Sequence, residues 1–348
     1  HDVFVGSGLP PDDAAICTDV LINADKHGID SHGIGRLKTI YYDRIKAGIL
    51  FPETSFDVIK DPSTTAVIDR VVGVRAMQLA IDKAREHGMG MVAVRNSSHY
   101  GICGYYLRMA ADAGMVGVTA TNARPSIAPT FGVENMLGTN PLTFGFPTDE
   151  EFPFLFDAAT SVSQRGKIEV YDRADKRIPA GWVIDKEGKT RTDTKQILRD
   201  LVAGTAALVP LGGIGETTGG HKGYGLATVV EVLCAGLCDG SSLKELLGWK
   251  NGKRVPYHLG HFFLAIDIEH FVPLPVFKAI AGNILRTLRA SDKAPEHDGI
   301  DTAREKEHMA WLDRKDRGAP VNDNLRKQMD TMRDELGLTQ YSFPWDRE

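Results

Sequence analysis

The chain has 348 residues, of which 42% are hydrophobic and 25% are charged, a composition typical of a folded protein of about two domains. Its 41 basic and 46 acidic residues give a net charge of −5 at pH 7, without the basic surplus typical of a nucleic-acid-binding protein. No apolar stretch reaches the roughly 18 residues that a membrane-spanning helix needs. We therefore expect no nucleic-acid partner, no membrane association and a cytoplasmic location.

Helical spacing of apolar residues predicts two helices near the start of the chain. The first follows the helix-start signal Pro10-Pro11-Asp12-Asp13 and ends at Gly28, and the second covers about 35–46. The polar, glycine-flanked segment 27–33 joins them. We expect this segment to be a turn between two helices with apolar inner faces.

The clearest pattern is a helix–strand–loop–helix–strand succession. It comprises a helix over 74–87, a strand over 91–94, a helix over about 103–113 and a strand over 115–120. Short elements in this alternation favour an α/β fold with parallel neighbouring strands. His99 then falls at the carboxyl end of a strand, where open α/β sheets bind ligands.

The rest of the chain is predicted as shorter strands, long loops and several helices. Strands are expected over 142–146, 154–156, 182–185 and 261–268, and helices over 224–236, 276–289 and 323–336. The charge run 301–317 mixes both signs and predicts a solvated helical face.

The glycine-rich segments do not form the dinucleotide fingerprint of a Rossmann fold. Gly33-Ile-Gly35 and Gly223-Tyr-Gly225 begin like it, but they lack the third glycine and the later acidic residue. At 219–223, His221 and Lys222 precede a predicted helix, whose free N–H groups favour anions. From the residues alone, the segment 219–223 is either a phosphate site or a tight loop that leads into a buried helix.

Two histidines are the candidate acid–base residues. An imidazole exchanges protons near neutral pH, and a guanidinium such as that of Arg36 binds a carboxylate through two hydrogen bonds. His32 and Arg36 therefore suit a substrate that carries a carboxylate beside a reacting oxygen. The alternative is that the two residues near the helix start are only a helix cap and a surface charge. For His99 the alternative is a structural histidine.

Metal and hydrolase chemistry are less favoured. The four cysteines are typical of reduced, buried thiols, and no Cys or His pair near Cys234 and Cys238 completes a zinc site. His27 and His32 lack a carboxylate at ligand spacing. No Gly-x-Ser-x-Gly motif supports a hydrolase triad. We therefore expect no metal site.

Several segments together resemble the malate/L-lactate dehydrogenase family of the second type. That family also holds ureidoglycolate, sulfolactate and other 2-hydroxyacid dehydrogenases and an imine reductase, and the resemblance spans about 13–291. The segments are Asp30-Ser-His-Gly-Ile-Gly-Arg36, Ser98-His-Tyr-Gly101, Leu137-Gly-Thr-Asn-Pro-Leu142, Phe156-Asp-Ala-Ala-Thr-Ser161 with Gly166-Lys167, and Gly219-Gly-His-Lys-Gly-Tyr-Gly-Leu-Ala227.

The resemblance implies a homodimer with a non-Rossmann, NAD(P)-binding α/β domain inserted in a helical domain formed by both termini. Residues 1–70 with 300–348 would form the helical and dimerisation domain. Residues 71–299 would form the α/β domain that binds cofactor and substrate. The implied cofactor is NAD or NADP, and we favour NAD.

The resemblance also implies roles for individual residues. His99 would accept the proton, Ser31 and His32 would orient or relay, and Lys167 would polarise the substrate oxygen. Which of His32 and His99 is the acceptor stays open. Substrate would contact Arg36, Thr139 and Asn140, and cofactor would contact His99, Tyr100, Gly101, Ile102, Cys103, Asp157, Ala158, Ala159, Thr160, His221, Lys222 and Gly223.

The expected reaction is hydride transfer between NAD(P) and a small 2-hydroxy acid, with malate favoured. L-lactate or another 2-hydroxy acid is the first alternative. Reduction of a cyclic imino acid is less favoured, because the imine-reducing branch has an Asp where this chain has Lys167. A non-catalytic nucleotide-binding protein is the remaining alternative.

Overall fold

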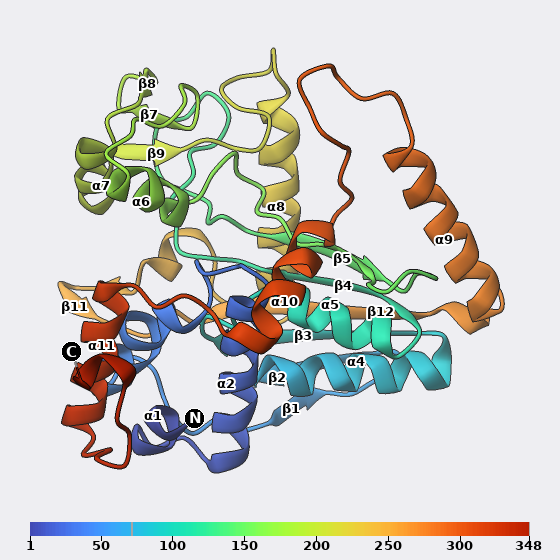
Figure 1. Cartoon of the computed structure of the whole chain (residues 1–348), viewed down its shortest axis with the longest axis horizontal. Coiled ribbons are helices and arrows are strands. Elements are labelled where there is room, and N and C mark those ends of the chain that lie inside the picture. Colours follow the sequence, from blue (N-terminus) through green and yellow to red (C-terminus); the bar gives the residue numbers. More distant parts are fainter. Residues whose placement is uncertain (71, 348) are drawn as a thin grey trace.

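The computed structural model describes residues 1–70 and 72–347. Helices from both ends of the chain lie together in Figure 1: α1 (Asp2–Gly6) and α2 (Pro11–Lys26) near the amino terminus, and α11 (Asp323–Glu335) near the carboxyl terminus. Phe4, Leu21 and Met332 share one buried apolar cluster that joins these helices. The predicted helices up to Gly28 and over 323–336 are confirmed.

The helix predicted over 35–46 is present but not uniform. It begins as a 3₁₀ turn, η1 (Ile34–Arg36), continues as a π-helix, η2 (Leu37–Tyr42), and ends as α3 (Asp43–Lys46). Tyr41 and Tyr42 are both buried, in the apolar cluster of the terminal helices. A π turn is rare and is frequent at functional sites.

A seven-stranded sheet forms the centre of the molecule, in the order β1-β2-β3-β12-β4-β5-β6. Helices α4 (Gly73–His87) and α5 (Cys103–Asp112) pack against it, and the α/β class is confirmed. The strands are β1 (Asp57–Lys60), β2 (Thr65–Asp69), β3 (Met89–Ser97), β4 (Met115–Thr121), β5 (Leu142–Phe146), β6 (Phe154–Phe156) and β12 (Leu259–Asp267).

The expected parallel pairing of neighbouring strands is wrong for β3 and β4. Strand β12 lies between them and is antiparallel to both, and among the described strand pairs only β2 and β3 are parallel. The reason is burial: β12 carries Phe262, Phe263 and Ala265, all buried, and in the centre of the sheet α4 and α8 (Gly220–Gly236) cover its two faces. A strand so far along the chain leaves no local sign of where it pairs.

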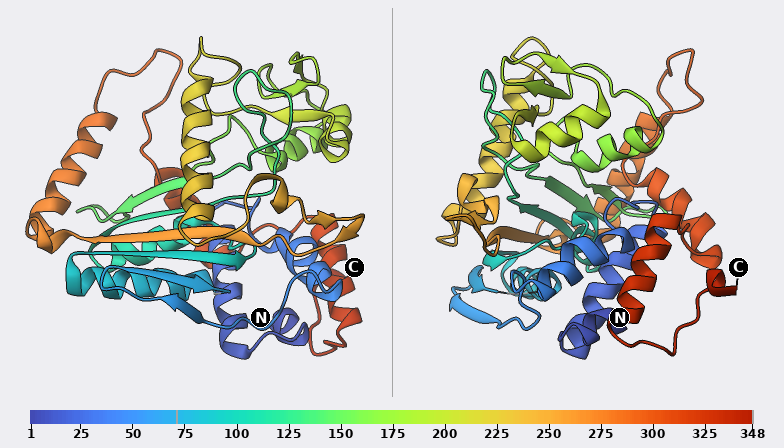
Figure 2. Two further views of the ribbon diagram at one scale, coloured as in Figure 1. Left: turned by 180° about the vertical axis from the view of Figure 1, so that it is seen from behind. Right: turned by 90° about the vertical axis from the view of Figure 1, so that its left-hand side faces the viewer.

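A smaller lobe follows strand β6. Its sheet has the order β8-β7-β9, from β7 (Val183–Asp185), β8 (Thr190–Arg191) and β9 (Ala206–Leu208). Helices α6 (Arg165–Arg173) and α7 (Thr194–Ala203), which the sequence analysis did not predict, enclose an apolar core of its own around Ile168, Val183 and Ile197. Figures 1 and 2 place this lobe beside α8 (Gly220–Gly236).

The remaining elements complete the outer layers. Helix α8 begins at Gly220, four residues earlier than predicted, so that 221–223 belong to its first turn and not to a preceding loop. Helices α9 (Leu274–Arg289) and α10 (Glu305–Arg317) follow; α9 lies on the side of α8 away from the small lobe. Shorter elements are η3 (Leu243–Leu247), β10 (Trp249–Lys250), β11 (Lys253–Arg254), η4 (Ile268–His270) and η5 (Pro344–Arg347).

Across residues 1–70 and 72–347, none of the helices is both long and apolar enough to cross a membrane.

Candidate active site

A cavity of about 700 Å³ lies where the terminal helices, the large sheet and the small lobe meet. Pockets of this size are typical of small-molecule and cofactor sites. The sequence-predicted residues that line it are Ser31, His32, His99, Tyr100, Gly101, Ile102, Cys103, Thr139, Asp157, Ala158, Ala159 and Lys167.

His99 occupies the predicted place, two residues beyond the end of β3. Its Nδ1 lies 2.7 Å from the hydroxyl of Tyr41 and 3.3 Å from the backbone nitrogen of Gly101. Burial lowers the pKa of His99 well below its ordinary value, and His32 and Arg36 lower it further. The imidazole is therefore neutral at pH 7, the state in which it can accept a proton.

His32 lies face to face with His99. The ring centroids are 5.7 Å apart and the planes differ by 19°. The hydroxyl of Ser31 is 2.9 Å from Nδ1 of His32. Burial, with a smaller contribution from Arg36, lowers the pKa of His32 to about 4. Two neutral imidazoles thus share one wall of the cavity, and either can exchange a proton with a ligand there.

The turn that carries Ser31 and His32 is fixed from below by Asp25. A carboxylate oxygen of Asp25 accepts a 2.7 Å hydrogen bond from the backbone N–H of Ile34. Gly33 is required for this approach, because a Cβ there would lie 1.8 Å from Oδ1 of Asp25. Burial raises the pKa of Asp25 to about 6.

Helix α10 fixes the same turn from the side. Arg314 donates a 2.5 Å hydrogen bond to the carboxylate of Asp30 and a 2.7 Å hydrogen bond to the backbone oxygen of Asp25. Residues nearly 300 positions apart therefore hold one turn of the site. The position of His32 depends on the carboxyl-terminal helices as well as on its own segment.

Asp157 links strand β6 to helix α5. Its carboxylate accepts a 2.7 Å hydrogen bond from the backbone N–H of Gly104, in the first turn of α5, where a negative charge is favourable. The side chain is accessible from the cavity but lies deep in the molecule, and this desolvation raises its pKa. The contact fixes the segment 99–103 between β3 and α5.

Lys167 reaches the cavity from α6 of the small lobe. Unlike the two histidines it is exposed, and its Nζ lies 5.1 Å from the centre of the Trp182 ring. This is cation–π distance. Lys167 is thus held by one weak contact.

Three other predicted residues stand behind the wall and not on it. Arg36 does not line the cavity; its Nε donates a 2.5 Å hydrogen bond to the backbone oxygen of Ser31. The side-chain amide of Asn140 donates to Glu231 at 2.8 Å and is fully buried. Thr160 donates to the backbone oxygen of Asn140 at 2.9 Å. In this structure the polar groups of these three side chains bond other protein groups and are not directed into the cavity.

The segment 221–223 also lies outside the cavity wall. His221 and Lys222 are exposed, while Gly223 is buried against Leu211, whose backbone oxygen would lie 2.2 Å from a Cβ at that position. Leu211 itself lines the cavity. The first turn of α8 therefore supports the wall from behind.

Sequence reasoning missed the contribution of the segment before and within α10. Asp301, Thr302, Ala303, Arg304, Lys306 and Glu307 all line the cavity. Arg304 is only 6% exposed, and burial lowers its pKa to about 10. The prediction of a solvated helical face over 301–317 is therefore wrong at its start, because a run of mixed charge has no local sign of which residues turn inward.

Thr121 and Asn122 were also missed, and here a signal was available. They line the cavity at the end of β4, Thr121 as its last residue and Asn122 as the next, much as His99 does beyond β3. The rule that ligands bind beyond the carboxyl ends of strands applies to both.

In the parts of the chain that the structure describes, no three His, Cys, Asp or Glu side chains are grouped as a metal site. The cysteines are free thiols, three of them buried.

Known proteins share this architecture over nearly the whole chain. The family model described as malate/L-lactate dehydrogenase matches residues 1–330. A malate dehydrogenase from Pyrococcus horikoshii is 41% identical over 97% of this chain and 92% of its own length. An L-sulfolactate dehydrogenase from Methanocaldococcus jannaschii is 37% identical over 97% of this chain and 94% of its own.

A crystal structure of malate dehydrogenase from Entamoeba histolytica superposes with a TM-score of 0.94, at 42% identity, over 98% of this chain and 95% of the other. The family model, the related sequences and the superposition all point to one family. This chain is a member of the malate/L-lactate dehydrogenase family.

Proposed function

We propose that the protein is an NAD(P)-dependent dehydrogenase that oxidises a small 2-hydroxy acid, malate in the first place, and reduces oxaloacetate in reverse. The observation that carries the proposal is the pair of neutral, facing imidazoles of His32 and His99 on the wall of a cavity of about 700 Å³. The names of the P. horikoshii and E. histolytica relatives support malate as substrate.

The chain's own residues supply proton transfer and orientation. His99 accepts the hydroxyl proton, and Ser31 and His32 orient the reacting oxygen. Lys167, a cation on the cavity wall, stabilises negative charge on that oxygen. Arg36, directly behind Ser31, is the proposed partner of the substrate carboxylate, a role that requires its guanidinium to extend past the Ser31 backbone.

The cavity wall suits a dinucleotide. The buried Arg304 lines the cavity, and among the described residues its side chain makes no hydrogen bond or ion pair, although the charges of Glu307 and Asp157 act on it; an anionic phosphate would give it a bonded partner. The segment 100–103 and residues 157–159 are the further proposed contacts. When bound, the nicotinamide cofactor would accept the hydride from C2 of the substrate.

The test is a panel of substrates and cofactors. The protein is mixed with NADH or NADPH, and loss of the reduced-nicotinamide absorbance is followed on addition of oxaloacetate, pyruvate, glyoxylate or a cyclic imino acid. We expect oxaloacetate with NADH to give the highest kcat/KM. Turnover of the imino acid alone, or binding of the dinucleotide without turnover of any substrate, would refute the proposal.

We also propose a homodimer. Helix α9 exposes an apolar residue at every fourth position, Val276, Ile280, Ile284 and Leu288, on a face that no described element covers. An exposed apolar stripe of this kind is typical of a protein–protein interface. Sedimentation equilibrium should give twice the chain mass, and the paired change of Ile280 and Ile284 to Glu should give a monomer. A wild-type monomer would contradict this assignment.

Two further assignments remain proposals. The division into a helical domain (1–70 with 300–348) and an α/β domain (71–299) is supported by the apolar cluster that joins Phe4 to Met332. Limited proteolysis should cut near both boundaries. A cytoplasmic location is supported by the free cysteines, since reducing compartments keep thiols reduced.

A further inference from the structure

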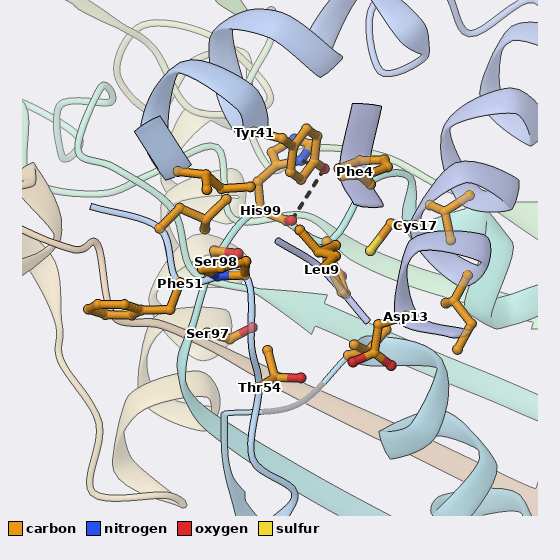
Figure 3. Close-up of a pocket in the computed structure, with 18 of the residues that line it drawn as sticks. Phe4, Leu9, Asp13, Cys17, Tyr41, Phe51, Thr54, Ser97, Ser98 and His99 are labelled. Atoms are coloured by element: carbon orange, nitrogen blue, oxygen red, sulfur yellow. Dashed lines mark hydrogen bonds between the residues drawn. The ribbon is translucent and has the colours of Figure 1, made fainter. Parts of the chain in front are cut away.

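A second cavity, of about 100 Å³, adjoins His99 away from the site already described. Figure 3 shows Tyr41 and His99 together at one end of it and Asp13, Thr54 and Ser97 at the other. Phe51 and Thr54 on its wall are exposed, so the cavity reaches solvent. A buried water needs roughly 10–15 Å³ of such space, so several water molecules fit.

The hydroxyl of Tyr41 connects this cavity to the imidazole. Its oxygen lies 2.7 Å from Nδ1 of His99 and 3.3 Å from the backbone oxygen of His99. A hydroxyl both donates and accepts. In one arrangement the Tyr41 hydroxyl accepts a hydrogen bond from Nδ1–H of His99 and donates to the backbone oxygen of His99. In the other arrangement the hydroxyl donates to an unprotonated Nδ1, which then also accepts from the backbone N–H of Gly101 at 3.3 Å.

These two arrangements differ only in the positions of protons. Burial raises the pKa of Tyr41 above its ordinary value, so that the hydroxyl keeps its proton on average and exchanges it only in transit. The pair therefore behaves as a two-position proton carrier between Nδ1 and the cavity.

The surroundings of His99 oppose a charged ring. His32, Arg36, Arg44 and His261 all act against protonation of His99, in addition to its burial. If His99 accepted a substrate proton and kept its own, an imidazolium would form beside two guanidinium groups. Release of the second proton from Nδ1 at the same time would leave the ring neutral.

We propose that Tyr41 and the cavity behind it form a proton exit route from His99. The inference rests on the proposed function. As the C–H bond at C2 breaks and its hydride leaves to the oxidised nicotinamide, the O–H proton passes to Nε2 and the C=O bond forms. The proton on Nδ1 passes to the Tyr41 oxygen, and the hydroxyl proton of Tyr41 passes to water in the cavity.

The balance is one hydride to the cofactor and one proton to cavity water, with His99 neutral before and after. The ring returns to its starting tautomer once the product has left: Nε2 gives its proton to solvent in the open site, and Nδ1 regains one through Tyr41. Tyr41 acts through His99 and is a positioning residue, not a group that touches substrate.

The test compares Tyr41→Phe with Tyr42→Phe in the full-length protein. Tyr42 is the matched control, because its hydroxyl bonds Glu335 at 2.6 Å and does not line the cavity. Stopped-flow mixing with malate and NAD⁺ follows reduced nicotinamide and, in weak buffer with an indicator dye, released protons during the first turnover.

In the wild type and in Tyr42→Phe, protons should appear at the same rate as reduced nicotinamide. In Tyr41→Phe the hydride step should slow about tenfold or more, and protons should appear only with product release. Cys17→Met, which narrows the cavity and leaves the Tyr41–His99 contact in place, should show the same lag.

Synchronous proton release in both Tyr41→Phe and Cys17→Met would overturn the exit route while leaving the proposed function intact. A wild-type protein that forms no reduced nicotinamide with any 2-hydroxy acid would refute the proposed function, and the exit route with it.

Discussion

The two walls of the large cavity are built differently. The inner wall, defined here as Ser31, His32, His99 and Asp157, consists of side chains held by neighbours from distant segments. The hydroxyl of Tyr41 bonds His99 and the N–H of Gly104 bonds Asp157. The outer wall, defined as Gln164 and Lys167 of the small lobe, is held more loosely, because Lys167 has one cation–π contact.

This difference matches the demands of the two tasks. Proton transfer requires hydrogen-bond geometry between the base and the reacting oxygen, and a small displacement is costly. A cation that stabilises charge acts over a longer distance and tolerates motion. We infer that the inner wall sets the chemistry and that the outer wall adjusts to the ligand.

The largest effect should come from the inner wall. His99→Ala should lower kcat about a hundredfold or more, because the substitution removes the proposed proton acceptor. Dinucleotide affinity, measured by titration of the reduced cofactor's fluorescence, should change little. His270→Ala, at an exposed histidine, is the control. Unchanged turnover in His99→Ala would remove the distinction between the walls.

A substitution in the turn that supports the inner wall should also have a large effect, measured as a loss of stability. Gly33→Ala places a Cβ 1.8 Å from Oδ1 of Asp25, so the turn or the carboxylate must move and the bond to Ile34 is lost. We expect a loss of about 2–3 kcal/mol in the free energy of unfolding, measured in urea. In Gly35→Ala the nearest atom lies 3.7 Å away, and the change should be within about 0.5 kcal/mol.

The outer wall should respond less. Lys167→Ala should lower kcat about tenfold, one order of magnitude less than His99→Ala, because the loss is a long-range charge interaction. Lys176→Ala, at an exposed position on the same lobe, serves for comparison. A loss in Lys167→Ala as large as in His99→Ala would show that the outer wall also has fixed geometry.

The smallest effect concerns pH and Asp25. Because burial raises the pKa of this carboxyl to about 6, the folded state favours the protonated acid. Its destabilising contribution is absent below the unfolded pKa near 3.8, grows as pH rises from there, and is complete above the folded pKa of about 6. Between pH 5 and 7, wild type should therefore lose about 1 kcal/mol of stability relative to Asp25→Asn. A difference that is independent of pH would contradict this.

The sequence predicted best where structure is local. The elements from α4 to β4 were placed almost correctly, since their apolar spacing and the glycines at 88 and 114 mark them without reference to the rest of the chain. The place of His99 at a strand end followed from the same pattern. Helices α6 and α7 were missed because they belong to a small lobe whose core is assembled from short segments.

Contacts between segments that are distant along the chain could not be predicted from the sequence. Nothing near Arg304 or Arg314 signals that one lines the cavity and the other holds the turn of Ser31. Asn140 was matched to a motif as a substrate contact, but its amide is directed to Glu231, which the motif does not reveal. The π turn over Leu37–Tyr42 likewise leaves no recognisable spacing.

The central position of β12 has a consequence for synthesis on the ribosome. Strands β3 and β4, made early, have no hydrogen-bonded partner between them until residues 259–267 have emerged. The nascent chain must carry two unpaired, apolar strand edges while residues 122–258 are synthesised, a state prone to aggregation. Since Arg304 and Arg314 emerge later still, ribosome-bound fragments should gain protease resistance and the capacity to bind ligand only near the completion of the chain.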